Sequence, residues 1–255
     1  MASYRLVDER LGELLREFGP PRRAIHTEFP FWRLQGDGVW ALDRAGDVSV
    51  TSSGDAHKTA LLRHNVRGGL PEPIYDTLRA NPRLASEVAR DLLAAHFPET
   101  RHDDILHAVG LDPEFAAGSR RKMRDPGFRR AVLRAYEHRC AVCGFDIRLG
   151  ARSLALDAAH IKWHQAGGPD DVQNGLALCV LHHKLFDEGA FTLSPPGERS
   201  VVLVSEAAIG TTGFDEWLGR FHKQAVREPI RETYHPNVRF LAWNVREVFQ
   251  SPERP

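Results

Sequence analysis

Apolar residues recur at helical spacing in several stretches of the chain. In residues 4–18, leucines and Phe18 lie mostly three or four positions apart, and a Gly-Pro-Pro sequence ends the pattern. This spacing predicts an amphipathic helix, because residues three and four positions apart share one helix face. Residues 71–78 and 84–96 show similar patterns on either side of an Asn-Pro pair, and they predict two more helices.

A different pattern occupies residues 39–51. Two short apolar runs, residues 39–42 and 48–51, flank a polar stretch that contains a glycine, as the strands of a hairpin do. Helices and strands together predict an α+β domain over residues 1–105. Residues 106–120 show little sustained periodicity, and we interpret them as a linker.

The second half of the chain begins with a helix signal. Asp125 can serve as an N-cap, Pro126 suits the first helical position, and apolar residues follow at helical spacing. These features predict a helix over residues 126–138. We expect a second domain over residues 121–255, and we assign the whole chain to the α+β class.

The composition, with 42% hydrophobic and 27% charged residues, is that of a globular protein. The N-terminus lacks the apolar core of a secretory signal, and no apolar run reaches the length of a membrane span, so we expect a cytoplasmic protein without membrane contact. The formal net charge is zero, yet residues 120–148 hold nine basic residues against three acidic ones. Such a run suits a phosphate-binding surface or a solvated helix face equally well.

All three cysteines fall in this second half, and they lie close together along the chain. Two residues separate Cys140 from Cys143, and two residues separate Cys179 from His182. These four residues predict a Cys3His zinc site, because thiolates and imidazole are the donors of closed structural zinc sites. An odd number of thiols in a reducing compartment argues against a disulfide. The neighbouring His183 is an alternative fourth ligand, although the spacing favours His182.

Residues with catalytic chemistry lie in and around this cysteine region. His160 and Asn174 fall between the two predicted ligand pairs, and His183 follows the second pair directly. The order of these residues resembles the HNH nuclease family over roughly residues 125–195. The resemblance implies a ββα-metal fold built from a strand, a loop and a helix.

Hydrolysis of a phosphodiester explains why these residue types are needed. An imidazole with a pKa near neutrality suits a general base, and His160 is the expected base. His183 is the expected ligand of a catalytic divalent cation, Mg²⁺ or Mn²⁺, which neutralises the charge that builds on the phosphate. The resemblance implies that Asn174 holds the loop that aims His160.

One position departs from the commonest HNH pattern, which has an acidic metal ligand directly before the first histidine. Ala159 occupies that position here. Asp157 is the nearest carboxylate and a candidate ligand, although an offset of three from His160 need not direct it to the same metal. Asp187 is another candidate, with capping of a helix end as the alternative.

Two segments of the first half resemble the sulfur-binding domain of phosphorothioate-dependent, type IV (McrA-like) HNH restriction endonucleases. They are residues 26–34 (His-Thr-Glu-Phe-Pro-Phe-Trp-Arg-Leu) and residues 66–74 (Val-Arg-Gly-Gly-Leu-Pro-Glu-Pro-Ile). The resemblance implies a double-stranded DNA partner in which sulfur replaces one non-bridging phosphate oxygen.

The chemistry of sulfur points to candidate reader residues. Leu70, Pro71 and Ile74 could form an apolar cup, in which an unpaired oxygen would cost on the order of 1–3 kcal/mol and sulfur much less. Arg33 and Arg67 are candidate contacts to the DNA backbone around the cup. For Ile74, a position at the start of a helix packed in the core explains the sequence equally well.

We therefore expect a modification-dependent restriction endonuclease, which could act as a homodimer to cut both strands. Two alternatives stay open. One is an HNH nuclease whose first domain reads another modification or a sequence. The other is a zinc-stapled DNA-binding protein without catalysis, against which the complete set of HNH residues argues.

Overall fold

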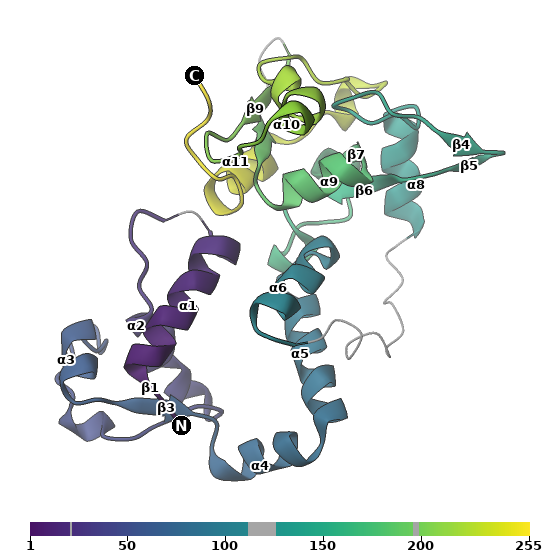
Figure 1. The fold of residues 1–255 in the computed structure, drawn as a ribbon. Helices are drawn as coiled ribbons and strands as arrows, with labels where there is room; N and C mark the ends of the chain where they lie inside the picture. The colour runs from purple at the N-terminus through teal and green to yellow at the C-terminus, as the bar shows by residue number, and fades with distance from the viewer. Residues whose placement is uncertain (21, 112–125, 196–198) are drawn as a thin grey trace. The chain divides into compact units, whose positions relative to one another are not determined.

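The structure is a computed structural model that describes residues 1–20, 22–111, 126–195 and 199–255 (Figure 1). The chain divides into two compact units, Met1–Ala89 and Arg90–Pro255. Much of the predicted linker, and the predicted N-cap Asp125, lie outside the described residues. The division into domains at residues 105 and 121 stays a prediction.

The first unit combines short strands with helices. Its elements are β1 (Ala2–Ser3), α1 (Tyr4–Phe18), α2 (Glu28–Arg33), η1 (Leu34–Asp37), β2 (Ala41–Leu42), η2 (Ala45–Asp47), α3 (Lys58–Arg63), β3 (Arg67–Gly69) and α4 (Glu72–Ala80). The boundary between the two units falls inside α5 (Pro82–His96). The three helices predicted from periodicity, α1, α4 and α5, are thereby confirmed.

A small aromatic and aliphatic core holds the first unit together. Tyr4, Phe31, Leu61 and Val66 are almost fully buried, and the rings of Tyr4 and Phe31 lie 4.9 Å apart. The Tyr4 hydroxyl forms a 2.8 Å hydrogen bond with Thr27 Oγ1, and burial raises the pKa of Tyr4 to about 12. This core fixes α1 and α2 beside the three-stranded sheet.

The predicted hairpin over residues 39–51 is wrong. The sheet has the antiparallel order β1-β3-β2, so the partner of β2 is the distant β3, with Ala41 opposite Gly69 and Leu42 opposite Gly68. The polar stretch after β2 forms the 3-10 helix η2 and not a two-strand turn. Packing explains the choice of partner: Trp40 lies against Gly68 so closely that an added Cβ would come within 2.6 Å of its ring.

The second unit contains the remaining elements. They are η3 (Glu99–Arg101), α6 (His102–Ala108), α8 (Pro126–Ala135), β4 (Arg148–Leu149), β5 (Arg152–Ser153), β6 (Leu156–His160), η4 (His164–Ala166), η5 (Val172–Asn174), β7 (Gly175–Cys179), α9 (Val180–Asp187), β8 (Phe191–Leu193), β9 (Val202–Val204), α10 (Thr212–Trp217), η6 (Gly219–Phe221), η7 (Glu232–Tyr234) and α11 (Val238–Glu247). Helix α6 extends three residues into the predicted linker. The predicted helix over residues 126–138 ends early, because Glu137 and His138 have positive φ angles of 53° and 58°.

The centre of the second unit is the antiparallel pair β6–β7, which places His160 opposite Gly175 and Leu156 opposite Cys179. Helices α8 and α9 both contact this pair. Side chains from all four elements share one core, which includes Val132, Leu176 and Phe186. The strand, loop, strand and helix order from β6 to α9 confirms the expected ββα arrangement (Figure 1).

The overall α+β class is confirmed by this mixture of helices and short strands. Among the described residues, no helix is both long and apolar enough to cross a membrane.

Candidate active site and metal centre

Four sulfur and nitrogen donors converge at the end of the ββα unit. The ligand atoms of Cys140, Cys143, Cys179 and His182 all lie within 4.8 Å of one another, close enough to hold one metal ion. Cys140 and Cys143 lie in the turn after α8, where the Gly144 amide donates to the Cys140 carbonyl. Cys179 ends β7, and His182 follows in the first turn of α9.

The surroundings prepare these donors for a metal. His182 is fully buried, its Nδ1 lies 3.1 Å from Cys179 Sγ, and its Nε2 lies 3.0 Å from the Trp217 carbonyl oxygen. A carbonyl can only accept, so Nε2 donates and Nδ1 keeps a lone pair for the metal. Hydrogen bonds among the thiols lower the pKa of Cys140 and raise the pKa of Cys179, so the cysteines share their protons and a bound metal ion would be needed to hold all three as thiolates.

The predicted general base lies at the end of β6. His160 Nε2 is 2.8 Å from Asp170 Oδ1, and its ring stacks on Phe128 of α8 with centroids 4.1 Å apart. The His160 side chain is 16% exposed, so part of the ring remains in contact with solvent. An aspartate beside a histidine stabilises the protonated imidazole, as in hydrolases that use a histidine base. Asp170 was not among the site residues predicted from the sequence, although a carboxylate after a Gly-Gly-Pro turn near His160 was a usable signal.

Asn174 holds the loop between β6 and β7. It is fully buried; its Oδ1 accepts the Lys162 N–H at 2.8 Å, while Nδ2 donates to the carbonyls of Lys162 and Pro169 at 3.0 and 2.9 Å. Its backbone carbonyl accepts the Ile161 N–H, directly after His160. The asparagine therefore closes the loop that follows His160 with both its side chain and its backbone.

Two glycines let this loop turn tightly. Gly167 has a φ of 78°, in the left-handed region that side chains disfavour, and an added Cβ on Gly168 would lie 1.9 Å from the Lys162 carbonyl oxygen. Side chains at these two positions would push the loop away from Asn174. The same turn leads directly to Asp170.

His183 lies on α9 between two carboxylates. Its Nδ1 is 3.3 Å from Asp157 Oδ2, and its Nε2 is 3.3 Å from Asp187 Oδ2. Asp157 shares a face of β6 with Ala159, because residues two apart on a strand point the same way. In the commonest HNH pattern the acidic ligand occupies the position of Ala159. Asp157 therefore points to the same side of β6 as that ligand would, although it lies three residues before His160.

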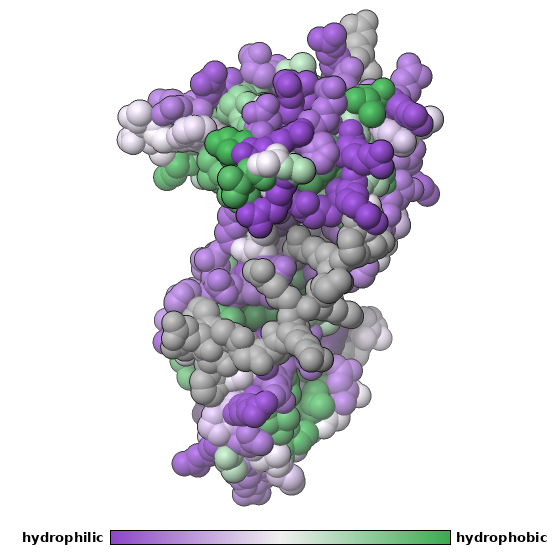
Figure 2. Space-filling view, turned by 90° about the vertical axis from the view of Figure 1, so that its right-hand side faces the viewer, coloured by the Kyte–Doolittle hydropathy of each residue, from purple (hydrophilic) through white to green (hydrophobic). Residues whose placement is uncertain are grey.

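A basic surface adjoins the same strand. On α8 and the β4–β5 hairpin the exposed arginines are Arg129, Arg130, Arg134, Arg148 and Arg152. Arg129 Nη2 donates to the Leu156 carbonyl at 2.7 Å. Burial, followed by positive charge from three of these arginines, lowers the pKa of His138. The hairpin lies at the right-hand side of Figure 1, which is the side that faces the viewer in Figure 2. The upper part of Figure 2 is mostly hydrophilic, with some hydrophobic residues among the hydrophilic ones.

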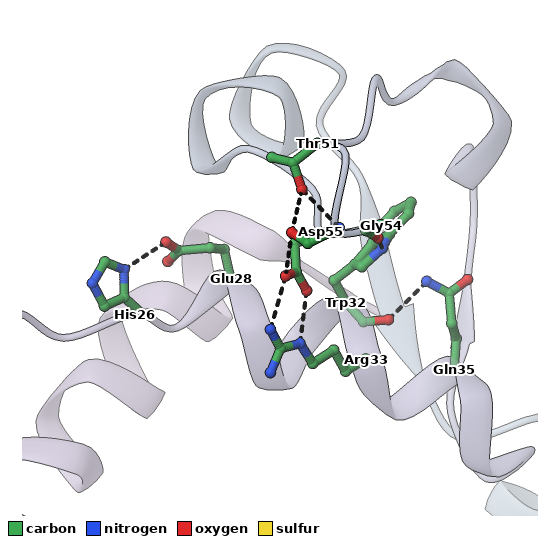
Figure 3. A network of polar contacts seen from close by, with 9 residues as sticks. His26, Glu28, Trp32, Arg33, Gln35, Thr51, Gly54 and Asp55 are labelled. Atoms are coloured by element: carbon green, nitrogen blue, oxygen red, sulfur yellow. Dashed lines mark hydrogen bonds and ion pairs between the residues drawn. The ribbon is translucent and has the colours of Figure 1, made fainter.

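In the first unit, the predicted backbone contact Arg33 belongs to a polar network (Figure 3). Its Nε and Nη2 donate to the two carboxylate oxygens of Asp55 at 2.7 and 2.8 Å. This pair holds the pKa of Asp55 below its usual value. Ser53 donates to the Asp55 carboxylate, and the Asp55 amide donates to the Thr51 hydroxyl, which also bonds Ser53. The fixed carboxylate holds the Arg33 guanidinium in one orientation, while the Arg33 side chain stays 62% exposed.

The other predicted reader residues cluster at the junction of β3 and α4. Arg67 Nε lies 2.7 Å from Asp43 Oδ2, and the Arg67 amide donates to the other oxygen of Asp43. Leu70 and Pro71 join β3 to α4, and Ile74 lies in the first turn of α4. All three apolar residues are half-buried, so each of them keeps part of its surface in contact with solvent.

Comparison with protein families first defines the class of the second half. Residues 140–194 match the family model described as HNH endonuclease. The match contains the two ligand pairs, His160, Asn174 and His183. The chain therefore contains an HNH endonuclease domain.

The first half matches a more specific family. Residues 1–114 match the model of the ScoMcrA-like DNA sulfur-binding domain. The chain thus joins a ScoMcrA-like DNA sulfur-binding domain to an HNH endonuclease domain.

Solved structures include relatives of the same kind. One is described as "Sulfur binding domain of ScoMcrA complexed with phosphorothioated DNA", with 24% identity, a TM-score of 0.38, and coverage of 45% of this chain and 73% of that one. Another is the "Modification dependent TagI restriction endonuclease", with 24% identity, a TM-score of 0.32, and coverage of 48% and 37%. A third is the "Type IV phosphorothioation-dependent restriction endonuclease ScoMcrA", with 25% identity, a TM-score of 0.37, and coverage of 51% and 27%.

These TM-scores are too low for the placement of the elements to carry an argument, and the match spans only 37% and 27% of the chains of the two restriction endonucleases. No curated protein matches the chain.

Proposed function

We propose that this protein is a modification-dependent restriction endonuclease, which binds phosphorothioated double-stranded DNA through residues 1–105 and hydrolyses phosphodiester bonds in residues 121–255. The observation that carries the proposal is the joint match to a sulfur-binding domain and an HNH endonuclease in one chain. The geometry around His160, Asn174 and His183 supports catalysis over binding alone, because each of these residues has the partners that its chemical role requires.

His160 acts as the general base in this proposal. It takes a proton from the attacking water, and the Asp170 carboxylate 2.8 Å away stabilises the imidazolium that results. Stacking on Phe128 restricts rotation of the ring. Asn174 keeps the loop closed, so that the ring is held in one orientation before substrate binds.

Asp157 and His183 are the proposed ligands of the catalytic divalent cation. Their Oδ2 and Nδ1 atoms lie 3.3 Å apart, so both could contact one divalent cation. A bound Mg²⁺ or Mn²⁺ would neutralise the charge that develops on the phosphate and on the leaving 3′ oxygen. The two residues come from β6 and α9, so the packed ββα core sets their separation.

Zinc is the proposed metal of the cluster formed by Cys140, Cys143, Cys179 and His182. A Cys3His set whose donor atoms all lie within 4.8 Å of one another is typical of structural zinc, which adds folding free energy on the order of 10 kcal/mol. The cluster joins the turn after α8 to the start of α9. Zinc would therefore hold the two helices on either side of the β6–β7 pair.

In the reader, Leu70, Pro71 and Ile74 are proposed to receive the sulfur. A non-bridging oxygen placed against these apolar groups would lose hydrogen bonds to water without replacement, at a cost of about 1–3 kcal/mol. Arg33 and Arg67 are proposed to contact neighbouring phosphates. A guanidinium carries five N–H donors, and the pairs with Asp55 and Asp43 use only some of them while fixing the orientation of the rest.

The basic surface on α8 and the β4–β5 hairpin is proposed to bind the DNA backbone beside the catalytic residues. Arg129 ties it to β6 through the Leu156 carbonyl, one residue before Asp157. Such contacts act through counterion release, and they are independent of sequence and of sulfur. We also propose that two copies act together to cut both strands.

The proposal is tested by comparing two duplexes of identical sequence, one phosphorothioated and one plain. His160→Ala protein, which should bind without cutting, is titrated with each duplex at two salt concentrations. The phosphorothioated duplex should bind at least tenfold more tightly, because roughly 1.4 kcal/mol of discrimination corresponds to a factor of ten. Leu70→Asn should reduce this ratio toward one, whereas the control Leu6→Asn on exposed α1 should leave it unchanged. Equal binding of both duplexes by the His160→Ala parent would remove sulfur recognition from the proposal.

A further inference from the structure

The last residue of α9, Asp187, is held by a residue far from the HNH motif. Asp187 is 1% exposed, and its Oδ2 accepts a hydrogen bond from the hydroxyl of Thr100 in η3. The same oxygen lies 3.3 Å from His183 Nε2. Thr100 falls within the stretch that matches the sulfur-binding domain, yet it belongs to the compact unit Arg90–Pro255 that contains the nuclease residues.

The two carboxylates around His183 differ in their access to solvent. The Asp157 side chain at Nδ1 is 37% exposed, whereas the Asp187 side chain at Nε2 is 2% exposed. A neutral imidazole has one N–H donor and one lone pair, so only one of its nitrogens can bind a metal. A hydrated divalent cation needs room for its water ligands. Nδ1 beside Asp157 is therefore the metal-binding nitrogen, and Nε2–H donates to Asp187.

Further contacts fasten η3 to α9 around this hydrogen bond. The Lys184 ammonium donates to the Thr100 carbonyl and to Asp104. Arg101, which is 3% exposed, pairs with Glu188 at 3.1 Å. These contacts hold the Thr100 carbonyl and the following residue Arg101 against α9, and the Thr100 hydroxyl donates to Asp187 from this fixed segment.

We propose that Thr100 is a positioning residue of the nuclease: by holding Asp187, it fixes the tautomer and orientation in which His183 offers Nδ1 to the catalytic metal. This inference rests on the proposed metal site at Asp157 and His183. It also means that a functional nuclease includes residues 99–104, upstream of the segment that matches the HNH family. A hydrogen-bonded partner of a metal-binding histidine changes metal affinity by about 10- to 100-fold.

The experiment measures binding of Mn²⁺ alone to full-length, zinc-loaded protein by isothermal titration. Thr100→Val, which keeps the shape but removes the hydroxyl, should weaken Mn²⁺ binding about tenfold or more. Thr100→Ser, which keeps the hydroxyl, should bind within about twofold of the parent. The control is Thr77→Val in α4, where the lost hydroxyl donates to the Pro73 carbonyl of the same helix, and its Mn²⁺ affinity should not change. In cleavage assays, saturating Mn²⁺ should restore most of the rate of Thr100→Val, because the defect lies in metal binding.

Folding of each variant is checked by circular dichroism and zinc content. If Thr100→Val does not fold, Asp187→Asn replaces it, because the amide keeps the volume of the carboxylate but not its charge, and Mn²⁺ binding should again weaken at least tenfold. Parental Mn²⁺ affinity in folded Thr100→Val, or equal losses in the Ser and Val variants, would overturn the inference. Asp157→Asn distinguishes failure of the proposed metal site from failure of the proposed role of Thr100. If this variant leaves Mn²⁺ binding unchanged, the metal site is wrong, and the role of Thr100, which depends on it, is wrong as well.

Discussion

Replacing Asn174 with alanine isolates the contribution of the loop that holds His160. The substitution removes the three hydrogen bonds that link this side chain to Lys162 and Pro169, and it leaves the Lys162 amide without its side-chain acceptor. A buried hydrogen bond contributes a net free energy of about 1 kcal/mol. The closed loop therefore loses about 3 kcal/mol relative to open arrangements.

The expected kinetic effect follows from this free energy. If the loop must close around His160 in the transition state, a barrier raised by about 3 kcal/mol lowers kcat roughly 100-fold. Single-turnover cleavage of phosphorothioated DNA with Mn²⁺ measures the rate, and a urea titration measures the free energy of unfolding. Binding of DNA to the reader should not change, because Asn174 lies in the other compact unit.

Asn81→Ala is the matched control for this prediction. Asn81 Oδ1 accepts the Leu84 N–H at the start of α5, so its loss should lower stability by about 1 kcal/mol without slowing the cleavage step. An Asn174→Ala protein that cuts within about twofold of the parent rate would refute the idea that this loop aims the base. The same conclusion would follow if both asparagine variants slowed cleavage equally.

The remaining predictions concern the base, the zinc cluster and the basic surface. His160→Ala should reduce cleavage by at least 100-fold while DNA affinity and zinc content stay unchanged, and near-parental cutting would exclude this residue as the base. Native mass spectrometry should find one zinc per chain, and Cys140→Ser should yield a zinc-free protein with a lower melting temperature; a fully folded, metal-free parent would contradict the cluster assignment. Arg148→Ala combined with Arg152→Ala should weaken binding to both duplexes equally and reduce the salt dependence of binding by about two units of log–log slope. An unchanged salt dependence would show that Arg148 and Arg152 do not contact the DNA backbone.

Local patterns in the sequence are sufficient for the elements that depend on neighbouring residues. The helices α1, α4 and α5 follow from apolar spacing, because a helix presents every third or fourth residue on one face. The pairing of Cys140 with Cys143 and of Cys179 with His182 follows from chelation, since two intervening residues let both donors reach one ion. The order of His160, Asn174 and His183 is likewise a property of the chain alone.

Sheet partners do not follow from the same kind of pattern. The apolar runs around residues 39–51 have the pattern of a hairpin, but β2 pairs with β3 because Trp40 packs against Gly68. A strand pattern shows which face of the strand is apolar and says nothing about the identity of its neighbour. That choice depends on packing between residues far apart in the chain.

The class of the protein, its likeness to sulfur-binding and HNH domains, and the residue types of its site can all be read from the order of residues along the chain. The assignment of carboxylates to histidines depends on the folded arrangement: Asp170 lies at His160, Asp157 and Asp187 lie at the two different nitrogens of His183, and Thr100 contacts Asp187. A hydrogen bond requires two atoms within about 3 Å and in the right direction. For residues up to 87 positions apart, such as Thr100 and Asp187, only the packing of β6, α9 and η3 fixes that distance and direction.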